Sequence, residues 1–342
     1  CHLYLPRALL ESQPLILSIA GDSASGKSYF LATMSWELRR TLPRRFSVAF
    51  NDADPLANKI LTDNEQILFM PGDPEAYVAL EKTEQDGHLY RHVQLDDRHT
   101  AKLPKPFLFT LRPMGEHPNA GAATEMTRVL CFYDNAGETF QPGQDSATAP
   151  GTQHLARSKV LFFVFDPLRD PRFRERCIQI SQDPQLSDAL RPWRQATVLT
   201  EAAIRIRKHG NLTTHRKLDK PLIVLVAKSD VWGYLVDEDF RVEPLVSSNN
   251  DENGPAKVDI NRIESVSRKL RDLLLNLSPE FVAAAEDNFQ PVLYVPVSPL
   301  GGSPVRKEGL GGLAIRPKDI APRWVTAPIL YAFAKWSTGL IA

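Results

Sequence analysis

The sequence predicts an α/β fold in three layers, with a mostly parallel β-sheet between two layers of helices. Five continuous apolar runs carry this prediction, because strands that are covered on both faces of a sheet read as unbroken apolar segments. The runs span residues 15–20, 129–133, 160–165, 222–227 and 292–297. Amphipathic segments with helical spacing lie at 28–42 and 258–277, and a last helix is predicted to start near Pro328.

Composition narrows the classes of protein that fit this fold. The chain has 342 residues, with 41 Lys plus Arg and 41 Asp plus Glu, so its formal net charge is zero. A zero net charge argues against general nucleic-acid binding and against a polybasic membrane protein. Three scattered cysteines are too few for a disulfide framework, which makes a reducing cytoplasm the default location. No apolar run approaches the roughly 18 residues of a transmembrane helix.

Residues 14–342 are expected to form one domain that carries large insertions. The insertions are expected near 51–106, 167–198, 238–257 and 301–322, as loops or small added elements. Residues 1–13 are expected to be an N-terminal tail. The chain begins with Cys1-His2 and no methionine, so we interpret it as a fragment or a processed product. The Cys-His pair is either an ordinary tail or the remnant of a zinc-binding segment.

The strongest motif is Gly21-Asp22-Ser23-Ala24-Ser25-Gly26-Lys27-Ser28, which fits G-x-x-x-x-G-K-S/T between a predicted strand and a predicted helix. Glycines let such a loop wrap around phosphates, and its N–H groups point inward. Lys27 is expected to reach the β- and γ-phosphates, and Ser28 to offer its hydroxyl to Mg²⁺. The sequence therefore predicts a P-loop nucleoside triphosphatase in which all eight residues bind the nucleotide.

A second motif, Asp134-Asn135-Ala136-Gly137-Glu138, follows the run 129–133 and fits D-x-x-G. Here the chain resembles the G-domains of Ras-like and translation-factor-related GTPases. That resemblance implies that Asp134 holds Mg²⁺ through water and that the Gly137 N–H contacts the γ-phosphate. It also implies that Glu138 stands where many members carry the Gln or His that orients the attacking water. Because Glu occupies this place, hydrolysis is expected to be slow without a partner.

Two later motifs concern the base of the nucleotide. Ala227-Lys228-Ser229-Asp230 resembles the N-K-x-D motif of the same GTPases, in which Asp accepts hydrogen bonds from guanine and the Lys stem lies across the ring. The septins are similar in having Ala before this Lys, in place of the Asn that normally braces the loop. Ser298-Pro299-Leu300 follows the fifth run, where these GTPases place a loop that contacts the guanine oxygen. A solvated turn is the alternative interpretation of Lys228 and Asp230.

The order of the four motifs along the chain supports the interpretation of each one as part of a nucleotide site. All four are predicted at the carboxyl ends of strands, where ligands bind in open α/β sheets. The resemblance covers the frame from about Leu15 to Trp336 and leaves out the insertions.

Two features between the motifs are less specific. Residues 107–111 are predicted to form the one antiparallel strand, beside 127–133. Thr100, upstream of that strand, is the first choice for a threonine that binds Mg²⁺ in the triphosphate state, ahead of Thr110 and Thr124. A run of arginines follows 160–165 and is predicted to be a solvated helix face rather than an arginine finger; it comprises Arg169, Arg172, Arg174 and Arg176.

Three functional hypotheses remain open. The first is a Mg²⁺-dependent GTP-hydrolysing switch whose loops 90–125 and 138–158 change order on hydrolysis. The second is a catalytically weak, nucleotide-gated scaffold. The third is an ATP-using kinase of a small, nucleoside-type molecule, because S-A-S-G-K-S also resembles uridine kinases. The Cys-His start and the pattern from Pro322 to Leu330 resemble GTPases of bacterial conflict or defence systems, which implies a protein partner or effector. A homodimer stays open as well.

Overall fold

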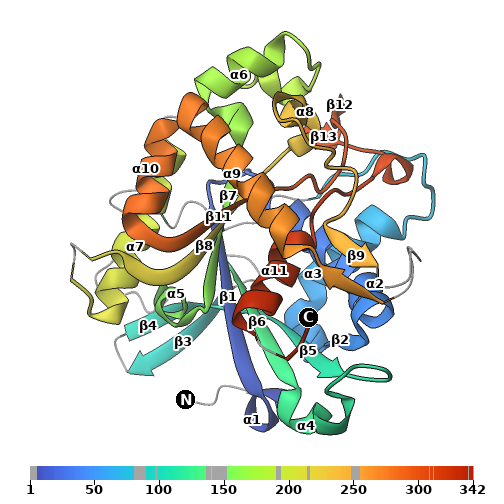
Figure 1. The fold of residues 1–342 in the computed structure, drawn as a ribbon, viewed down its shortest axis with the longest axis vertical. Coiled ribbons are helices and arrows are strands. Elements are labelled where there is room, and N and C mark those ends of the chain that lie inside the picture. Colours follow the sequence, from blue (N-terminus) through green and yellow to red (C-terminus); the bar gives the residue numbers. More distant parts are fainter. Residues whose placement is uncertain are drawn as a thin grey trace.

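A seven-stranded sheet forms the centre of the fold, in the order β11-β8-β7-β1-β6-β5-β2 (Figure 1). The computed structural model describes residues 6–80, 90–96, 99–135, 140, 152–189, 194–213, 216–247, 255–307, 309–310, 312–337 and 339–341. The strands of the sheet are β1 (Gln13–Gly21), β2 (Val48–Asp52), β5 (Phe107–Pro113), β6 (Arg128–Asp134), β7 (Val160–Phe165), β8 (Leu218–Val226) and β11 (Phe289–Pro296). Each of the five predicted apolar runs contributes one of these strands.

The direction of the strands confirms the predicted fold class. Strands β6, β1, β7, β8 and β11 run parallel to one another, with Leu17 opposite both Phe132 and Val160. Strand β5 runs antiparallel to β6 on one side and to β2 on the other. Every residue of β7 is buried, which explains its unbroken apolar sequence.

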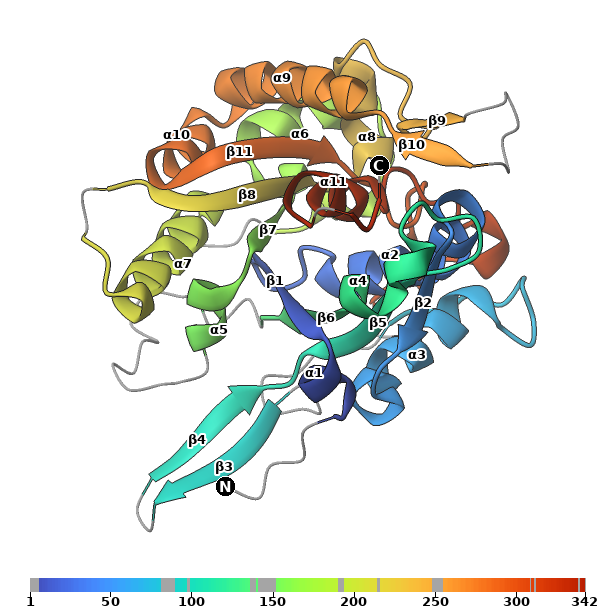
Figure 2. The ribbon, with the colours of Figure 1, turned by 60° about the horizontal axis from the view of Figure 1, so that its bottom comes forward.

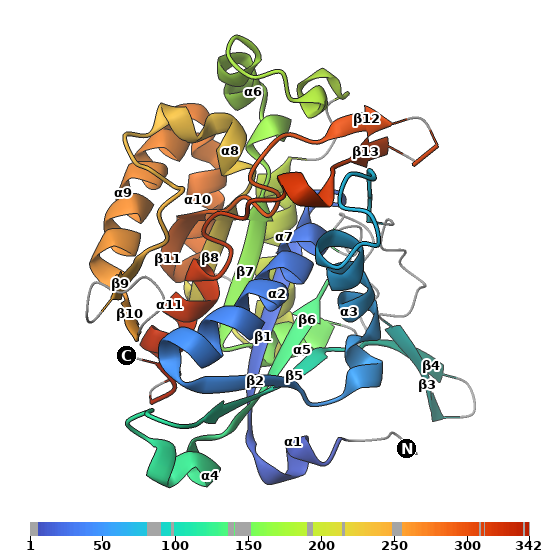
Figure 3. The same cartoon turned by 90° about the vertical axis from the view of Figure 1, so that its right-hand side faces the viewer.

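Helices cover both faces of this sheet. The longer ones are α2 (Lys27–Phe46), α3 (Pro55–Phe69), α7 (Gln195–Gly210), α9 (Ile260–Leu277), α10 (Pro279–Asn288) and α11 (Ala327–Trp336). Figures 1 and 3 show α2, α3 and α11 on one side of the sheet and α7 and α10 on the other. The shorter ones are α1 (Ala8–Glu11), α4 (Ala123–Met126), α5 (Gln153–Arg157), α6 (Pro171–Ile178) and α8 (Ser229–Trp232). None of the helices in the described ranges has both the length and the apolar character needed to cross a membrane.

The predicted insertions contain small elements of their own. These are α3 and the hairpin of β3 (Tyr90–Asp96) and β4 (His99–Pro104), then α6, then β9 (Leu245–Ser247) with β10 (Ala256–Val258), and finally β12 (Val305–Lys307) with β13 (Gly312–Ala314). Figure 2 shows the β3–β4 hairpin projecting from the body of the molecule. The α3 helix begins where the Asp54 carboxylate accepts hydrogen bonds from the N–H groups of Leu56 and Ala57.

The first and last insertions contact each other, which the sequence did not predict. The backbones of Val78 and Ile315 exchange two hydrogen bonds, of 2.9 and 3.0 Å. An ion pair of 2.6 Å joins Lys318 to Glu75 beside them. Segments more than 200 residues apart in the chain are thereby joined next to the carboxyl ends of the strands.

A buried carboxylate lies in the third insertion. One oxygen of Glu243, Oε1, accepts a hydrogen bond of 2.7 Å from the Trp324 backbone N–H. The other, Oε2, is buried and has no hydrogen-bond partner among the described residues. Burial raises the pKa of Glu243 to about 7, and nearby Glu37 acts in the same direction. The ionised form of this side chain therefore costs stability in the folded protein.

Glu243→Gln is expected to stabilise the protein at pH 8 and much less at acidic pH. Because the folded pKa lies above the unfolded one, the charged form penalises folding above pH 7, and the penalty shrinks as pH falls toward 4.5. Glutamine keeps an acceptor for Trp324 and has no charge. Urea unfolding should show a gain of about 2 kcal/mol at pH 8 and roughly half of that at pH 5.5. A gain that does not change with pH would contradict the assignment.

Candidate functional site

A cavity of about 420 Å³ lies at the carboxyl ends of the parallel strands. Its wall includes residues 23–30 after β1, Asp134 at the end of β6, Ala227, Lys228 and Asp230 after β8, and residues 297–300 after β11. The structure thus brings residues of all four predicted motifs to one cavity. Gly21 and Asp22 belong to the first loop but do not line the cavity themselves.

The loop 21–28 has the backbone conformation that its glycines allow. Gly26 has φ +99°, in the left-handed region, and a Cβ on Gly21 (φ +151°) would lie 2.9 Å from the Val164 carbonyl oxygen. Helix α2 begins directly after Gly26, so its unbonded N–H groups and positive dipole end stand at the cavity wall. Lys27 donates hydrogen bonds to the carbonyl oxygens of Gly21 (2.9 Å) and Asp22 (2.8 Å). A cationic, amide-lined wall of this kind suits an anion.

Asp134 adds a buried carboxylate to the lining of the same cavity. It is 5% exposed, and its Oδ1 has no hydrogen-bond partner within the part of the chain that the structure describes. Burial raises the pKa of Asp134 to about 6, although the Lys27 ammonium and the Asn135 N–H act in the opposite direction. A buried carboxylate oxygen without a partner, close to an anion site, fits a divalent cation. Ser28 lines the same cavity with its hydroxyl oxygen as a further ligand of the right chemistry.

Asn135 fixes the turn after Asp134. Its side-chain amide donates to the Ile19 carbonyl oxygen in β1 (2.8 Å), and its Oδ1 lies 3.0 Å from Nε2 of His154. The His154 ring stacks on Tyr133 with 4.3 Å between the ring centroids. These contacts hold the end of β6 against both β1 and α5.

The far end of the cavity is built around Asp230. The Ser298 hydroxyl donates to the Asp230 carboxylate and accepts a hydrogen bond of 2.9 Å from the Gly301 N–H. Burial raises the pKa of Asp230, Asp183 acts in the same direction, and the bond from Ser298 opposes them. Gly301 has φ +73°, and a Cβ there would lie 1.7 Å from the Ala321 carbonyl oxygen. Only glycine therefore allows this loop to lie where it does.

Lys228 lies beside Asp230 with a left-handed backbone (φ +59°). Its ammonium is 2.7 Å from Oδ2 of Asp166, the fully buried residue that follows β7. Ala227 is held by its backbone, since its N–H donates to the Phe165 carbonyl oxygen and its own carbonyl oxygen accepts from Nε1 of Trp232.

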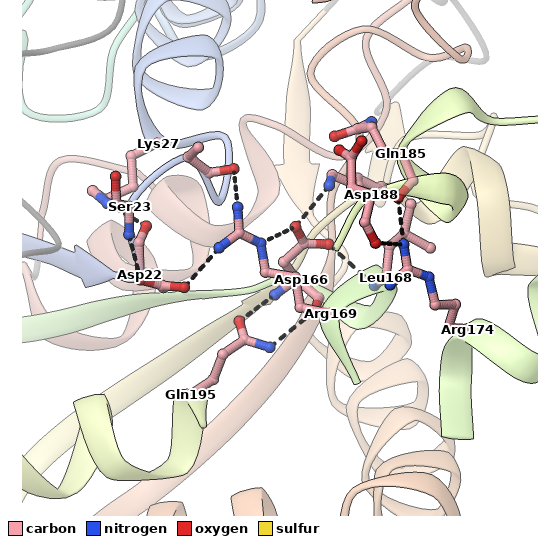
Figure 4. Close-up of polar contacts among 12 residues, drawn as sticks. Asp22, Ser23, Lys27, Asp166, Leu168, Arg169, Arg174, Gln185, Asp188 and Gln195 are labelled. Atoms are coloured by element: carbon pink, nitrogen blue, oxygen red, sulfur yellow. Dashed lines mark hydrogen bonds and ion pairs between the residues drawn. The ribbon is translucent and has the colours of Figure 1, made fainter. Parts of the chain in front are cut away.

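The prediction of a solvated arginine face is wrong for two of its four members. Arg169 lies before α6 and is 18% exposed, with its guanidinium between Asp22, the Ala24 carbonyl oxygen and Asp166 (Figure 4). Arg174 donates to three carbonyl oxygens of the following loop, those of Gln185, Leu186 and Asp188. Arg172 is 42% exposed and forms an ion pair with Glu280, as a surface residue would. A charged stretch directly after a fully buried strand is the signal that could have located Arg169 at the site.

Other predicted residues lie elsewhere or outside the described ranges. Gly137, Glu138 and Cys1 lie outside the described residues, as does most of the loop 138–158. Thr100 lies in β4, opposite Gln94 in the projecting hairpin, and is not among the described residues that line the cavity. Of its alternatives, Thr110 lies in β5 and Thr124 in α4.

Sequence reasoning missed several walls of the cavity. Ala79 and Leu80 from the first insertion line it. The Leu80 N–H donates a hydrogen bond of 3.0 Å to the hydroxyl of Tyr29, the residue that directly follows the phosphate-loop motif. The last insertion supplies Leu310 and Leu313, and Asp183 belongs to the loop after α6. These are single residues in loops or, for Leu313, in the three-residue strand β13, so no periodic pattern in the sequence marks them.

Comparison with known proteins finds a similar sequence and several distant structures. No protein-family model matches the chain. A Mycolicibacterium smegmatis protein, SaeC, is 26% identical over 96% of this chain and 78% of its own length. Its name describes it, provisionally, as an ESX-1 scaffolding and assembly protein.

The solved structures share little sequence with this chain. The GTPase-like domain of Saccharomyces cerevisiae Ski7, bound to GTP, matches 90% of this chain and 50% of its own with 14% identity and a TM-score of 0.30. Methanococcus maripaludis elongation factor SelB matches 84% of this chain and 30% of its own, with 9% identity and a TM-score of 0.25. Aquifex aeolicus Era, bound to GDP and AlF4⁻, matches 84% and 52%, with 15% identity and a TM-score of 0.25. The chain thus spans about half or less of the length of these solved chains.

Proposed function

We propose that this chain binds GTP together with Mg²⁺ and hydrolyses it to GDP and phosphate as a molecular switch. One observation carries the proposal: residues from each of the four predicted motifs, which are spread over more than 270 residues, line a single cavity at the carboxyl ends of the strands. The cavity has a cationic, amide-lined wall at Lys27, a buried carboxylate at Asp134 and a second carboxylate at Asp230. These chemistries match a triphosphate, a divalent cation and a base with N–H donors.

Each residue has a distinct role in this proposal. Lys27 and the N–H groups of residues 21–28 hold the β- and γ-phosphates, while Ser28 and Asp134 hold Mg²⁺. When bound, Mg²⁺ neutralises charge on the phosphate oxygens. Gly137 and Glu138 are proposed to contact the γ-phosphate and the attacking water, as the resemblance implies. Thr100 lies in the projecting hairpin and is not among the described residues that line the cavity, so its contact with Mg²⁺ stays a prediction.

The base end sets specificity in the same proposal. Asp230 accepts hydrogen bonds from the guanine N–H donors, and the stem of Lys228 lies along the ring. Ser298, Pro299 and Leu300 line the same end of the cavity, and the Ser298 hydroxyl bonds Asp230. We assign this loop to the guanine oxygen, as the resemblance implies. Adenine does not present the same donors, so this end should prefer GTP to ATP.

Titration of labelled GTP, GDP and ATP with Mg²⁺ tests this directly. Asp230→Ala is expected to lower the preference for GTP over ATP by about 30-fold, or roughly 2 kcal/mol, because two hydrogen bonds to a carboxylate are lost. Asp219→Ala is the matched control, since Asp219 is an exposed aspartate at the other end of the same strand, β8. An unchanged ratio in Asp230→Ala would remove the base-reading assignment.

A nucleotide-gated scaffold is the second candidate, and the name of the related sequence favours it. SaeC is described as a scaffolding and assembly protein, and its similarity extends over nearly the whole of this chain. In a scaffold, nucleotide binding would persist with negligible turnover. Multiple-turnover release of phosphate separates the two candidates: sustained release favours the hydrolase, and stoichiometric binding without release favours the scaffold.

Two further ideas rest on sequence resemblance alone. A nucleoside-type kinase would bind ATP and ignore GTP in the same titration. A place among the GTPases of bacterial conflict systems, with a protein effector or a homodimer, would require a partner that binds in only one nucleotide state.

A further inference from the structure

A chain of charged side chains joins the two ends of the cavity (Figure 4). The Arg169 guanidinium donates through Nη1 to Oδ2 of Asp22 (2.6 Å) and through Nη2 to the Ala24 carbonyl oxygen (3.0 Å). Its Nε donates to Oδ2 of Asp166 (3.2 Å). The same carboxylate oxygen accepts the Lys228 ammonium at 2.7 Å. One arginine thus contacts the phosphate-loop motif directly and the base-end lysine through a shared carboxylate.

Asp166 is a rigid centre for these contacts. It is fully buried, and its Oδ1 accepts a hydrogen bond from the Leu168 N–H. The Gln195 amide bonds its backbone twice, accepting from the Asp166 N–H (2.7 Å) and donating to the Asp166 carbonyl oxygen (2.9 Å). The N–H, the carbonyl oxygen and both carboxylate oxygens of Asp166 each have a hydrogen-bond partner. Rotation of the Asp166 side chain to follow a shift of Arg169 or Lys228 would therefore break other hydrogen bonds.

The contact at Ala24 has a conformational reason. Ala24 has φ +56°, a left-handed backbone that is strained for a residue with a Cβ. Arg169 bonds the carbonyl oxygen of this residue, and its partner Asp22 also accepts from the Ser23 N–H (2.7 Å). The guanidinium therefore holds the loop in the shape that surrounds a phosphate.

The base-end loop does not supply this brace itself. Ala227 precedes Lys228 and carries only a methyl group, so its side chain cannot donate a hydrogen bond to the phosphate-loop motif. Its backbone is committed to Phe165 and Trp232. The fork of an arginine guanidinium suits the task because it offers several donors in one plane, directed at a carboxylate and a carbonyl oxygen at once.

We infer that Arg169 is a positioning residue that fixes the phosphate loop relative to the base-reading pair Lys228 and Asp230. This inference rests on the proposed binding of guanine nucleotide. Arg169 makes its bonds to the protein and is not among the described residues that line the cavity, so it acts on the nucleotide through Asp22, Ala24 and Asp166. Losing it should affect both ends of the nucleotide together.

Arg169→Gln tests the inference by equilibrium titration with GTP and ATP in Mg²⁺. We expect the Kd for GTP to rise about tenfold and the preference for GTP over ATP to fall at least about threefold. An arginine that only stabilised the phosphate loop would weaken GTP and ATP by the same factor. Arg172→Gln is the matched control, because Arg172 lies three residues further on, pairs with Glu280 at the surface and should leave both Kd values unchanged.

Two further variants keep the test decisive if Arg169→Gln does not fold. Arg169→Lys keeps the charge but cannot bond Asp22, Ala24 and Asp166 at the same time. It should therefore lower the preference for GTP over ATP as well, but by less than Arg169→Gln does. In a double-mutant cycle, Arg169→Lys and Asp22→Asn should be non-additive in their effect on GTP affinity. Unchanged GTP affinity, or equal losses for GTP and ATP, would overturn the inference while leaving the proposed function intact. Failure of the wild-type protein to bind GTP would overturn the proposed function itself.

Discussion

Replacing Lys27 by Ala is expected to lower the affinity for GTP by about 1,000-fold, which corresponds to roughly 4 kcal/mol. Lys27 is buried at the cavity wall, and its ammonium points into the loop, where it contacts the Gly21 and Asp22 carbonyl oxygens. Without it, a triphosphate would face these carbonyl oxygens with no cation between them. The loss should therefore be larger than the loss of one ordinary hydrogen bond.

The measurement is a titration of labelled GTP and GDP against the variant and the wild type. Lys59→Ala serves as the control, because Lys59 is exposed on α3 and pairs with Asp63 along the same helix. The thermal unfolding midpoint without nucleotide checks that the variant is folded. GTP binding by Lys27→Ala within about threefold of the wild type would mean that the phosphates do not lie at this loop, and the proposed function would fall with it.

The sheet and the main helices could be predicted because the burial of a strand or a helix requires a recognisable pattern of apolar residues in its sequence. A strand such as β7, with all six residues buried, needs an unbroken apolar sequence, and α9 needs its apolar residues at helical spacing. The loop 21–28 was equally visible, since wrapping a backbone around phosphates needs glycine at defined positions. Local sequence is sufficient wherever local geometry sets the requirement.

The rest of the site depends on contacts between distant segments, which leave no local pattern. The role of Arg169 follows from the approach of the segment after β7 to the phosphate-loop motif, and its neighbours in sequence are ordinary charged residues. The position of Thr100 before a strand predicts a Mg²⁺ ligand, but the chain between β2 and β5 forms a helix and a hairpin, and this places Thr100 in β4, outside the described lining of the cavity. The contact between Glu75 and Lys318 is likewise set by the fold alone.

Asp134→Asn is expected to weaken the effect of Mg²⁺ on GTP binding by about 100-fold and, without nucleotide, to stabilise the protein. The first effect follows because the amide removes the negative charge that a divalent cation requires at this place. The second follows because the carboxylate is buried with one oxygen unpartnered among the described residues. A residue that costs stability in the empty protein and gains its partner on binding is typical of a functional site.

The sign of the stability effect depends on pH. The pKa of Asp134 is raised from 3.8 to about 6, so the folded protein disfavours the charged form, and this penalty is complete above pH 6. As pH falls below 6 the carboxyl group is protonated first in the folded protein, and the penalty declines until it is protonated in the unfolded protein as well, below pH 3.8. Urea unfolding of Asp134→Asn should therefore show a gain of about 2–3 kcal/mol at pH 7.5 and roughly half of that at pH 5.

Both arms of this experiment use the same protein and the same control. Asp219→Asn changes an exposed aspartate on β8 and should alter neither the Mg²⁺ dependence nor the stability. If Asp134→Asn loses the Mg²⁺ effect but gains no stability, the carboxylate has a partner in the empty protein and the cation displaces it. If it gains stability but keeps the Mg²⁺ effect, Asp134 is a buried structural carboxylate and the cation is held by other residues. The assignment of Asp134 to Mg²⁺ would then be wrong, whereas the assignment of Lys27 to the phosphates would stand.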